Sequence, residues 1–240
     1  MKYKISDLRA SNLQIISVHP DSPLSEATTK MMVNDFSQLP VISKKNILEG
    51  YISWKTIGTQ KSIMNKKDIV KEYMDKNAPI LKTSDNILDS VNHILEKEFV
   101  FIKNDSDETT GIITIYDIAF QFKQLSEPII YLELIENSLR KIIEKSMKLE
   151  EMLKFVNINS RDRIKTIKDL SFGDYNNIIE NKEGWEKLNL NLDRKVMRKK
   201  LGYVNTIRNN LMHFKTEVKS EDIQILKEVS KFFRVLQKAS

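Results

Sequence analysis

The residues best suited to chemistry lie together near the end of the printed sequence, in Arg208-Asn209-Asn210-Leu211-Met212-His213. His213 is one of only 3 histidines, and an imidazole can accept and release a proton near neutral pH. The Arg208 guanidinium can hold a phosphate through paired hydrogen bonds. Asn209 and His213 are spaced to share one face of a helix. This set of side chains suits acid–base chemistry on a phosphodiester bond.

Positive charge is concentrated in the same half of the chain. Residues 1–126 carry 16 Lys and Arg and 16 Asp and Glu, whereas residues 127–240 carry 23 and 17, so the formal charge of +6 belongs to the second half. Such a domain suits a polyanionic partner, and nucleic acid is the leading candidate. Lysine-rich helix surfaces that are merely solvated would give the same count.

Part of this charge forms a basic run just before the motif, on the same predicted helix. Its cations are Arg194, Lys195, Arg198 and Lys199. They could form a phosphate track that guides RNA, in which case binding would weaken steeply with salt. The alternative is an ordinary solvated helix face. No metal site is predicted, because the chain has no cysteine and the other histidines have no partner at metal-ligand spacing.

The elements that must position these residues are predicted to be helices throughout residues 126–240. Apolar residues recur at intervals of three and four from about residue 127 to 155, with Pro128 in the first turn of that helix. A short helix over roughly 172–181 follows, then one from about 192 to 214 and one after Ser220. The pattern favours an all-α bundle of four or five helices.

The first half of the chain repeats itself with an offset of about 60 residues. Each copy predicts a short strand, a capping cluster, a helix, two strands joined by a turn, and a second helix. The equivalent strands are 39–42 with 47–53 and 99–102 with 110–114, and the closing helices begin near Trp54 and Tyr116. Asp21 or Ser22, and Ser84 or Asp85, are predicted to cap the first helices. Two β-α-β-β-α units over residues 1–125 imply an α+β fold.

This repeat resembles the CBS-domain pair, or Bateman module, over roughly residues 5–125. The stretches that carry the resemblance are LPVI at 39–42, GYISWKT at 50–56 and GIITIYD at 111–117. The resemblance implies a regulatory adenine nucleotide, such as AMP, ADP or ATP. It assigns Asp117 to the ribose hydroxyls and Thr114 to the phosphate or ribose, with Gly111 leaving room for phosphate.

The two copies differ at the last position of that motif. The first copy keeps Gly50 and Ser53 but has Thr56 where the family has Asp. A threonine cannot accept hydrogen bonds through two oxygens as a carboxylate does. We therefore expect one good nucleotide site and one weak or empty site at Ser53 and Thr56. The alternative is a CBS pair that dimerises and binds no ligand.

The helical half resembles the HEPN domain over roughly residues 127–240. The resemblance rests on the Arg-Asn-x-x-x-His motif, on YLELIENSLRKII at 131–143 and on LSFGDYNNII at 170–179. It implies metal-independent cleavage of RNA, such as tRNA, that leaves a 2′,3′-cyclic phosphate. His213 would move protons, Arg208 would stabilise charge on the phosphorane, and Asn209 would orient the phosphate or the imidazole. In this family the groove forms between two chains, which implies a homodimer.

Together the two resemblances favour a nucleotide-regulated endoribonuclease that acts as a defence or stress toxin, and an antitoxin is then an expected partner. The catalytic step would need no cofactor. The alternative is a non-catalytic adenine-nucleotide sensor or scaffold whose helical half mediates dimerisation or partner binding. We expect a cytoplasmic protein, because the sequence shows neither a signal-peptide pattern nor an apolar run of about 20 residues.

Overall fold

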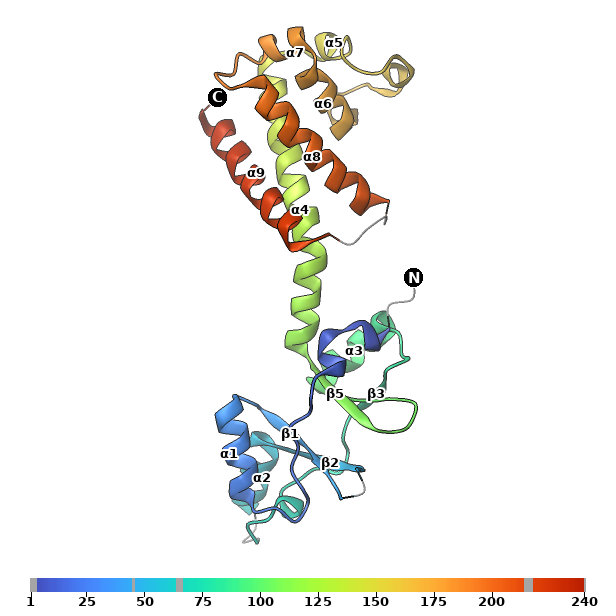
Figure 1. Cartoon of the computed structure of the whole chain (residues 1–240), viewed down its shortest axis with the longest axis vertical. Coiled ribbons are helices and arrows are strands. Elements are labelled where there is room, and N and C mark those ends of the chain that lie inside the picture. Colours follow the sequence, from blue (N-terminus) through green and yellow to red (C-terminus); the bar gives the residue numbers. More distant parts are fainter. Residues whose placement is uncertain (1–3, 45, 64–66, 214–217, 240) are drawn as a thin grey trace. The chain divides into compact units, whose positions relative to one another are not determined.

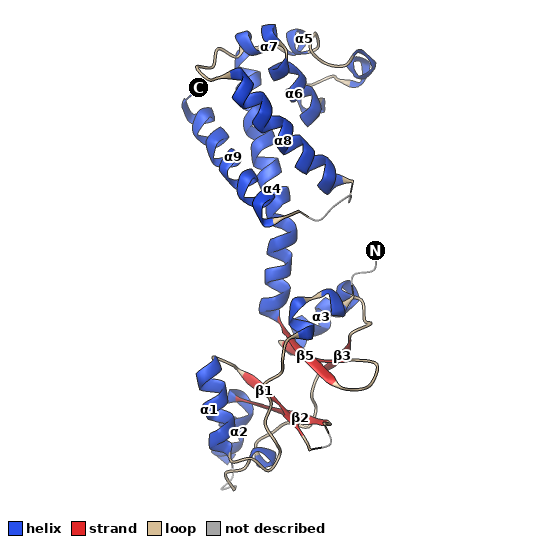
Figure 2. Ribbon diagram, in the orientation of Figure 1, coloured by secondary structure: helices blue, strands red, loops and turns tan. Residues whose placement is uncertain are grey.

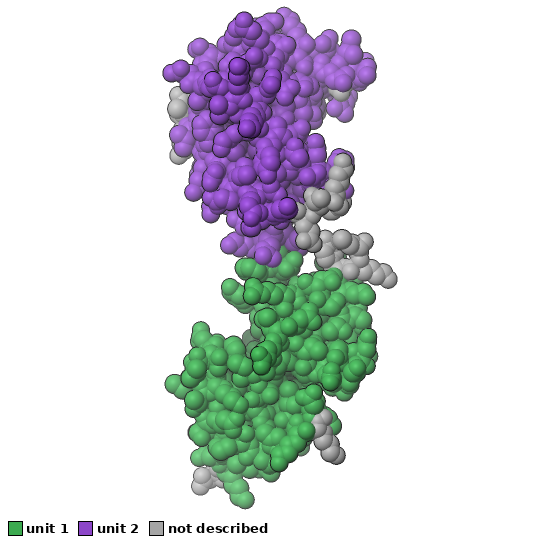
Figure 3. Space-filling view, in the orientation of Figure 1, with its two compact units in different colours: residues 1–122 green, residues 123–240 purple. Residues whose placement is uncertain are grey.

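The computed structural model describes residues 4–44, 46–63, 67–213 and 218–239. It contains two compact units, residues 1–122 and residues 123–240 (Figure 3). All strands within the described residues belong to the first unit, and the second is helical (Figure 2). The fold therefore has an α+β part followed by a helix-rich part.

The first repeat of unit 1 is built on a two-stranded antiparallel sheet (Figure 1). Its strands are β1 (Gln38–Ile42) and β2 (Leu48–Ser53), and its helices are α1 (Leu24–Asn34) and α2 (Trp54–Ile63). Its core buries apolar side chains from these elements and from the short helix η3 (Val70–Glu72). The start of α2 at Trp54 agrees with the prediction. The predicted first strand is wrong, because residues around Val18 form only a single bridge, to Val41.

The second repeat has a three-stranded sheet in the order β3-β4-β5. Strand β3 (Ile80–Lys82) runs parallel to β4 (Phe99–Lys103), which pairs antiparallel with β5 (Thr109–Thr114). Helix α3 (Ile87–Lys97) connects β3 to β4. The short helices η1 (Ile5–Asp7) and η2 (Arg9–Asn12) bury Ile5, Leu8 and Ala10 in this repeat's core. The beginning of the sequence thus completes the second repeat rather than the first.

The predicted helix caps are both wrong. Helix α1 begins after Pro23 with no side-chain cap, because the Leu24 N–H donates instead to the Asp68 carbonyl at 2.9 Å. Asp21 is paired with Lys71 at 2.8 Å. In the second repeat Asn86 caps α3 by accepting from the backbone of Leu88 and Asp89. Several neighbouring polar residues could cap each helix, judged by their spacing alone. Contacts with distant residues decide which group the first turn of the helix uses.

Aromatic side chains fasten the two repeats to each other. Tyr51 of β2 lies edge-on to Phe99 of β4, with ring centroids 5.0 Å apart, and Phe101 lies 5.5 Å from Phe99. Phe101 is fully buried. Such T-shaped pairs are favoured by the ring quadrupoles. By strand register Phe99 and Phe101 stand at the positions that Gln38 and Pro40 occupy in the first repeat, and this contact accounts for the aromatic residues there.

Helix α4 runs from Ile115 to Ser146 without a break. The predicted helix start near residue 127, with Pro128 in a first turn, is therefore wrong, as is the end near 155. Pro128 lies inside α4, where its missing N–H and its ring cost about 3 kcal/mol. Burial of one face of the same helix, including Leu132 and Ile135, offsets that cost.

The rest of unit 2 packs around the second part of α4. Helix α5 (Leu149–Met152) and the short helices η4 (Ile158–Arg163) and η5 (Ile167–Asp169) lead to the remaining elements, which are α6 (Phe172–Glu180), α7 (Lys182–Lys187), α8 (Arg194–Met212) and α9 (Ser220–Ala239). One apolar core joins them. Asn181 caps α7 by accepting hydrogen bonds from the backbone N–H groups of Glu183 and Gly184. The predicted helical half is confirmed, and its HEPN identity remains a prediction. No helix among the described residues has the length and apolar character needed to cross a bilayer.

Candidate functional site

Thr114 and Asp117 lie together where β5 meets α4. One carboxylate oxygen of Asp117, Oδ2, accepts from the Thr114 backbone N–H at 2.8 Å and from the Thr114 hydroxyl at 2.7 Å. The local geometry is a capping box that satisfies the first turn of the helix. The other oxygen, Oδ1, accepts no hydrogen bond from the described residues. Asp117 is half-buried, so this second oxygen remains available to a ligand.

The equivalent junction of the first repeat has the same hydrogen-bonding pattern without a charge. The Ser53 N–H donates to Thr56 Oγ1 at 2.9 Å, and the Thr56 N–H donates to Ser53 Oγ at 3.1 Å. The Thr56 hydroxyl in turn donates to the Ser53 carbonyl at 3.0 Å. The proton of that hydroxyl is therefore used within the turn. Thr56 has no second oxygen to offer, which supports the expectation of a weak or empty first site.

The Ser/Thr-x-x-Asp spacing by itself identifies a helix start and not a ligand site. Ser171 and Asp174 of unit 2 form the same box, with a hydroxyl-to-Oδ2 distance of 2.7 Å. Asp174, however, is only 4% exposed. Asp117 differs from Asp174 because its second carboxylate oxygen, Oδ1, is not used in capping and remains accessible.

The glycines of the two motifs are required by close backbone contact. A Cβ atom added at Gly111 would lie 2.5 Å from the Ala10 carbonyl oxygen, and one at Gly50 would overlap the Asp75 carbonyl oxygen. In both repeats a segment that leads on to the other repeat passes directly over the glycine. Close backbone contact is thus a structural reason for Gly111, and its predicted role toward phosphate stays a prediction.

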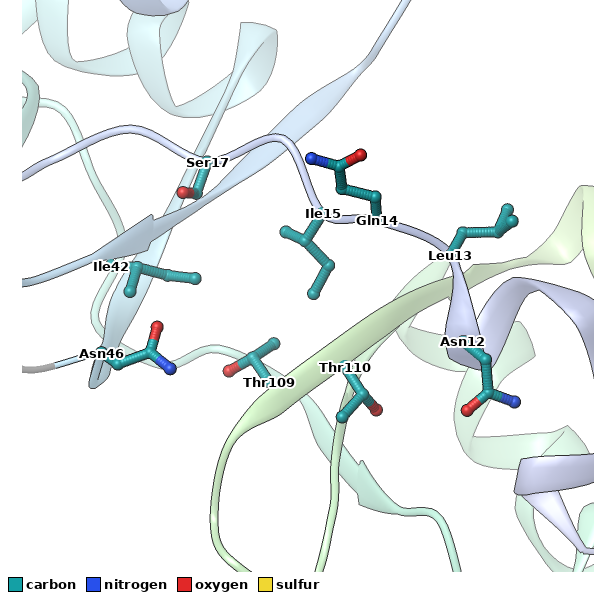
Figure 4. Close-up of a pocket in the computed structure, with 9 residues that line it drawn as sticks. All are labelled: Asn12, Leu13, Gln14, Ile15, Ser17, Ile42, Asn46, Thr109 and Thr110. Atoms are coloured by element: carbon teal, nitrogen blue, oxygen red, sulfur yellow. The ribbon is translucent and has the colours of Figure 1, made fainter.

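A cavity of about 500 Å³ lies beside the first residues of β5 (Figure 4). Three segments line it, namely residues 12–17, the β1–β2 hairpin and the start of β5. The lining consists of Asn12, Leu13, Gln14, Ile15, Ser17, Ile42, Asn46, Thr109 and Thr110. The lining combines amide, hydroxyl and aliphatic side chains, and none of the lining residues is charged. Such a lining suits a flat ring with polar edges more than an isolated phosphate.

Thr109 and Thr110 both line this cavity because the strand is irregular there. Gly111 pairs with Ile102 and Thr109 pairs with Lys103, so Thr110 is an extra residue in a β-bulge. Both threonine hydroxyls are buried without a hydrogen-bond partner among the described residues. Sequence analysis missed this cavity, because it depends on the bulge and on a distant segment crossing the strand.

The C-terminal motif lies at the end of α8. Arg208 donates to Asn209 Oδ1 at 3.2 Å, and both side chains are half-buried. His213 caps the helix through its backbone, which donates to the Asn209 carbonyl at 3.1 Å, and its ring is exposed. The structure therefore joins Arg208 and Asn209 directly. Among the described residues no hydrogen bond joins the imidazole to either of them.

Arg208 does not form an ion pair with Glu136 of α4. Glu136 pairs instead with Arg140 at 3.3 Å. Arg140 also donates to the Tyr175 hydroxyl at 2.9 Å, and this hydrogen bond is the main reason that the pKa of Arg140 is raised. Arg140 thus joins α4 to α6, whereas Arg208 forms no ion pair with a described residue.

Of the four predicted RNA-binding cations, Arg194 has a structural role. It donates to the Glu180 carbonyl at 3.0 Å and so satisfies a backbone acceptor at the end of α6. Lys195, Arg198 and Lys199 are exposed. At 100° per residue, Lys195 and Lys199 lie on the same side of α8 as Asn209 and His213. Lys195 and Lys199 therefore form an exposed basic surface on the side of α8 that carries Asn209 and His213.

Comparison with known proteins identifies the first half of the chain. The family model of the CBS domain matches residues 5–57 and 70–123. A search of curated proteins gives no match. Among solved structures, a hypothetical conserved protein from Geobacillus kaustophilus is 23% identical with a TM-score of 0.45, over 51% of this chain and 98% of its own.

Two similar solved structures contain adenosine compounds. CBSX2 in complex with AMP is 18% identical with a TM-score of 0.46, over 51% of this chain and 97% of its own. A CBS domain pair in complex with 5-methylthioadenosine and S-adenosyl-L-methionine is 18% identical with a TM-score of 0.45, over the same shares. The family match covers both repeats of unit 1, so the N-terminal half of this chain is a pair of CBS domains.

Proposed function

We propose that unit 1 binds one adenine nucleotide along β5 and that the chain is a nucleotide sensor. The observation that carries this proposal is the free Oδ1 of Asp117 at one end of β5, combined with an uncharged cavity at the other. At about 3.3 Å per residue, Thr110 and Thr114 are about 13 Å apart along the strand. That span is comparable with the extended length of a nucleotide.

The ribose is assigned to the Asp117 end. A carboxylate can accept hydrogen bonds from both hydroxyls of a ribose, and Asp117 keeps one oxygen for this purpose while the other caps α4. A hydrogen bond to a charged acceptor contributes about 1.5–3 kcal/mol. Loss of this acceptor should therefore weaken binding by at least about tenfold.

The base is assigned to the cavity. The Thr109 and Thr110 hydroxyls are buried without partners, and an unsatisfied buried group costs about 1–3 kcal/mol. The polar edge of an adenine could satisfy them, while Ile15 and Ile42 cover its faces. Two solved structures similar to unit 1 are complexes, one with AMP and one with 5-methylthioadenosine and S-adenosyl-L-methionine, so an adenosine compound is the class of ligand to test.

Calorimetric titration of the full chain with AMP, ATP and S-adenosyl-L-methionine tests this proposal. We expect at least one of these compounds to bind at a site in unit 1, seen as binding that Asp117→Asn weakens tenfold or more. Asp169→Asn is the matched control, because Asp169 caps an exposed turn with the same geometry at Thr166. Absence of binding by all three compounds, or equal weakening by both substitutions, would contradict the proposal.

RNA cleavage by unit 2 is a second candidate function. Two features favour it, namely an Arg208 that forms no ion pair with a described residue and an exposed His213 at the end of the same helix. In the proposed reaction His213 removes the proton of a ribose 2′-OH, and the 2′-oxygen bonds to the adjacent phosphorus. The bond from phosphorus to the 5′-oxygen breaks, and that oxygen takes a proton from a second imidazolium.

A homodimer would supply the second imidazole, because one chain places a single histidine at this motif. The Arg208 guanidinium would stabilise the charge on the phosphorane, held in place by Asn209. Nucleotide control requires that the ligand binds one arrangement of the dimer more tightly than another.

Incubation of the purified chain with total RNA in EDTA tests this second function. We expect fragments ending in 2′,3′-cyclic phosphate that disappear in both His213→Ala and Arg208→Ala. His93→Ala, in α3 of the CBS pair, is the control that should retain cleavage. Intact RNA with and without AMP or ATP would exclude the ribonuclease and leave the sensor or scaffold function.

A further inference from the structure

Unit 2 contains a cavity of its own, between α4 and α9. It has a volume of about 550 Å³, within the range of small-molecule sites. We call it the α4–α9 cavity. Its lining residues are Tyr131, Leu134, Asn137, Ser138 and Lys141 of α4, and Lys227, Ser230, Lys231, Arg234 and Gln237 of α9. None of these residues belongs to the Arg208–His213 motif or to the CBS pair.

The charge of this cavity is positive only. Lys141, Lys227, Lys231 and Arg234 line it, and the lining contains no acidic residue. None of the four cationic side chains forms an ion pair or a hydrogen bond with any residue that the structure describes. Elsewhere in unit 2 lysines form ion pairs with carboxylates, as Lys187 does with Glu151 at 2.6 Å. Four like charges around one cavity repel each other unless an anion lies among them.

The inner surface of the α4–α9 cavity offers hydrogen-bond donors. Ser138 is only 6% exposed, and its hydroxyl has no hydrogen-bond partner in the described chain. Asn137 uses its Oδ1 to accept from Arg140 at 3.3 Å, which leaves its amide N–H groups free. The Ser138 hydroxyl and the Asn137 amide are therefore free to donate to a ligand in this cavity. Donors beside cations are the arrangement that binds phosphate oxygens.

The same cavity also has an apolar wall. Leu134 is 46% exposed, and Tyr131 is held by a hydrogen bond from its hydroxyl to Glu127 at 3.0 Å. That bond fixes the phenol edge and leaves the ring to the cavity. The aliphatic parts of the lysines extend this surface. A ligand that matches both features has phosphate groups and a flat apolar body.

We propose that the α4–α9 cavity is a second nucleotide site, which binds a mononucleotide by its phosphates to Lys227, Lys231 and Arg234 and by its base against Tyr131 and Leu134. Ser138 and Asn137 would donate to the phosphate oxygens. This site is independent of the site proposed at Asp117. A chain with both sites would respond to nucleotide through its CBS pair and through its helical unit.

Titration with ATP as the probe tests this proposal on the full-length Asp117→Asn chain, so that the site in unit 1 is already weakened. We expect residual saturable binding of about one ATP per chain. Replacing Lys231 and Arg234 together by Gln should weaken that binding tenfold or more, and Ser138→Ala should weaken it by a smaller factor. Both exposed cations can be replaced without disturbing the core, and thermal melting confirms folding.

The matched control replaces Lys165 and Lys168 by Gln, which removes the same charge from another exposed part of the same unit. Equal weakening by the two double substitutions would mean diffuse electrostatic attraction and would overturn the site. Inorganic pyrophosphate tests the apolar wall. Pyrophosphate that binds as tightly as ATP would contradict a role for Tyr131 and Leu134, and absence of residual ATP binding would contradict the proposal altogether.

Discussion

The two CBS repeats begin their closing helices with the same turn but leave different groups unsatisfied. At Ser53 and Thr56 every hydroxyl is used within the turn. At Thr114 and Asp117 one carboxylate oxygen completes the turn and the other remains free. The same turn thus caps the closing helix in both repeats. In the second repeat it also leaves one carboxylate oxygen that can accept a hydrogen bond from a ligand.

The repeats also differ at the start of the preceding strand. Thr109 and Thr110 stand where the first repeat has Leu48 and Glu49, counted from the shared glycine. Only the second repeat therefore places buried, unpartnered hydroxyls beside a cavity. Both ends of the proposed ligand site change together, which indicates that the first repeat mainly supports the fold.

The largest expected effect concerns the strands that the two repeats place against each other. Phe101→Ala should lower the free energy of unfolding by about 3–5 kcal/mol, because it empties a fully buried aromatic position. Val41→Ala, at a fully buried position of β1 in the first repeat, removes two methyl groups and should cost about 2 kcal/mol. Urea denaturation measures both. Equal losses would show that the aromatic contact adds nothing to the second repeat.

The glycines should respond alike in both repeats. Gly50→Ala and Gly111→Ala each force a Cβ against a crossing backbone and should destabilise the fold by about 1–3 kcal/mol. Gly58→Ala, in α2, meets no atom within 4 Å and should instead stabilise by about 0.5–1 kcal/mol. Thermal melting of the three variants decides, and a neutral Gly111→Ala would refute the close approach.

Local features of the site were accessible from sequence. A spacing of three residues between Thr114 and Asp117 places both at one helix start whatever lies around them, and they do form a hydrogen-bonded pair. The two antiparallel strand pairs, β1 with β2 and β4 with β5, followed from apolar runs joined by polar turns. These inferences succeeded because each depends on residues close in sequence.

Features that depend on distant segments were not accessible. Asn86 rather than Ser84 or Asp85 caps α3, and Pro128 lies within a helix, because burial and backbone partners elsewhere decide between local alternatives. The cavity beside Thr110 requires residues 12–17 to cross a bulged strand. The sequence does not show that Arg194 donates to the Glu180 carbonyl, because the two residues belong to different helices.

Thr56→Asp tests whether a carboxylate is what the first repeat lacks. The new side chain can accept from Ser53 as Asp117 accepts from Thr114, and its second oxygen would be free. We expect a second, weaker phase of nucleotide binding in calorimetry, tightened by about tenfold over the parent, which corresponds to 1.4 kcal/mol. Thr56→Asn, which lacks the charge, should show no such phase.

The smallest expected effect concerns the unpartnered hydroxyls. Thr109→Val preserves shape and removes a buried group without a hydrogen bond, so it should raise the free energy of unfolding by about 1 kcal/mol. The same change should weaken nucleotide binding. Urea denaturation and calorimetry on one preparation measure both. A variant that loses stability, or that binds nucleotide as tightly as the parent, would separate Thr109 from the ligand site.

The central claim is that Asp117 holds the ribose of a bound adenine nucleotide. It is tested most directly by a binding cycle with AMP and 2′-deoxy-AMP on the parent chain and on Asp117→Asn. Our account predicts that removing the 2′-hydroxyl weakens binding to the parent by about tenfold and binding to the variant hardly at all. The same loss in both proteins would show that the ribose lies elsewhere and would contradict the account.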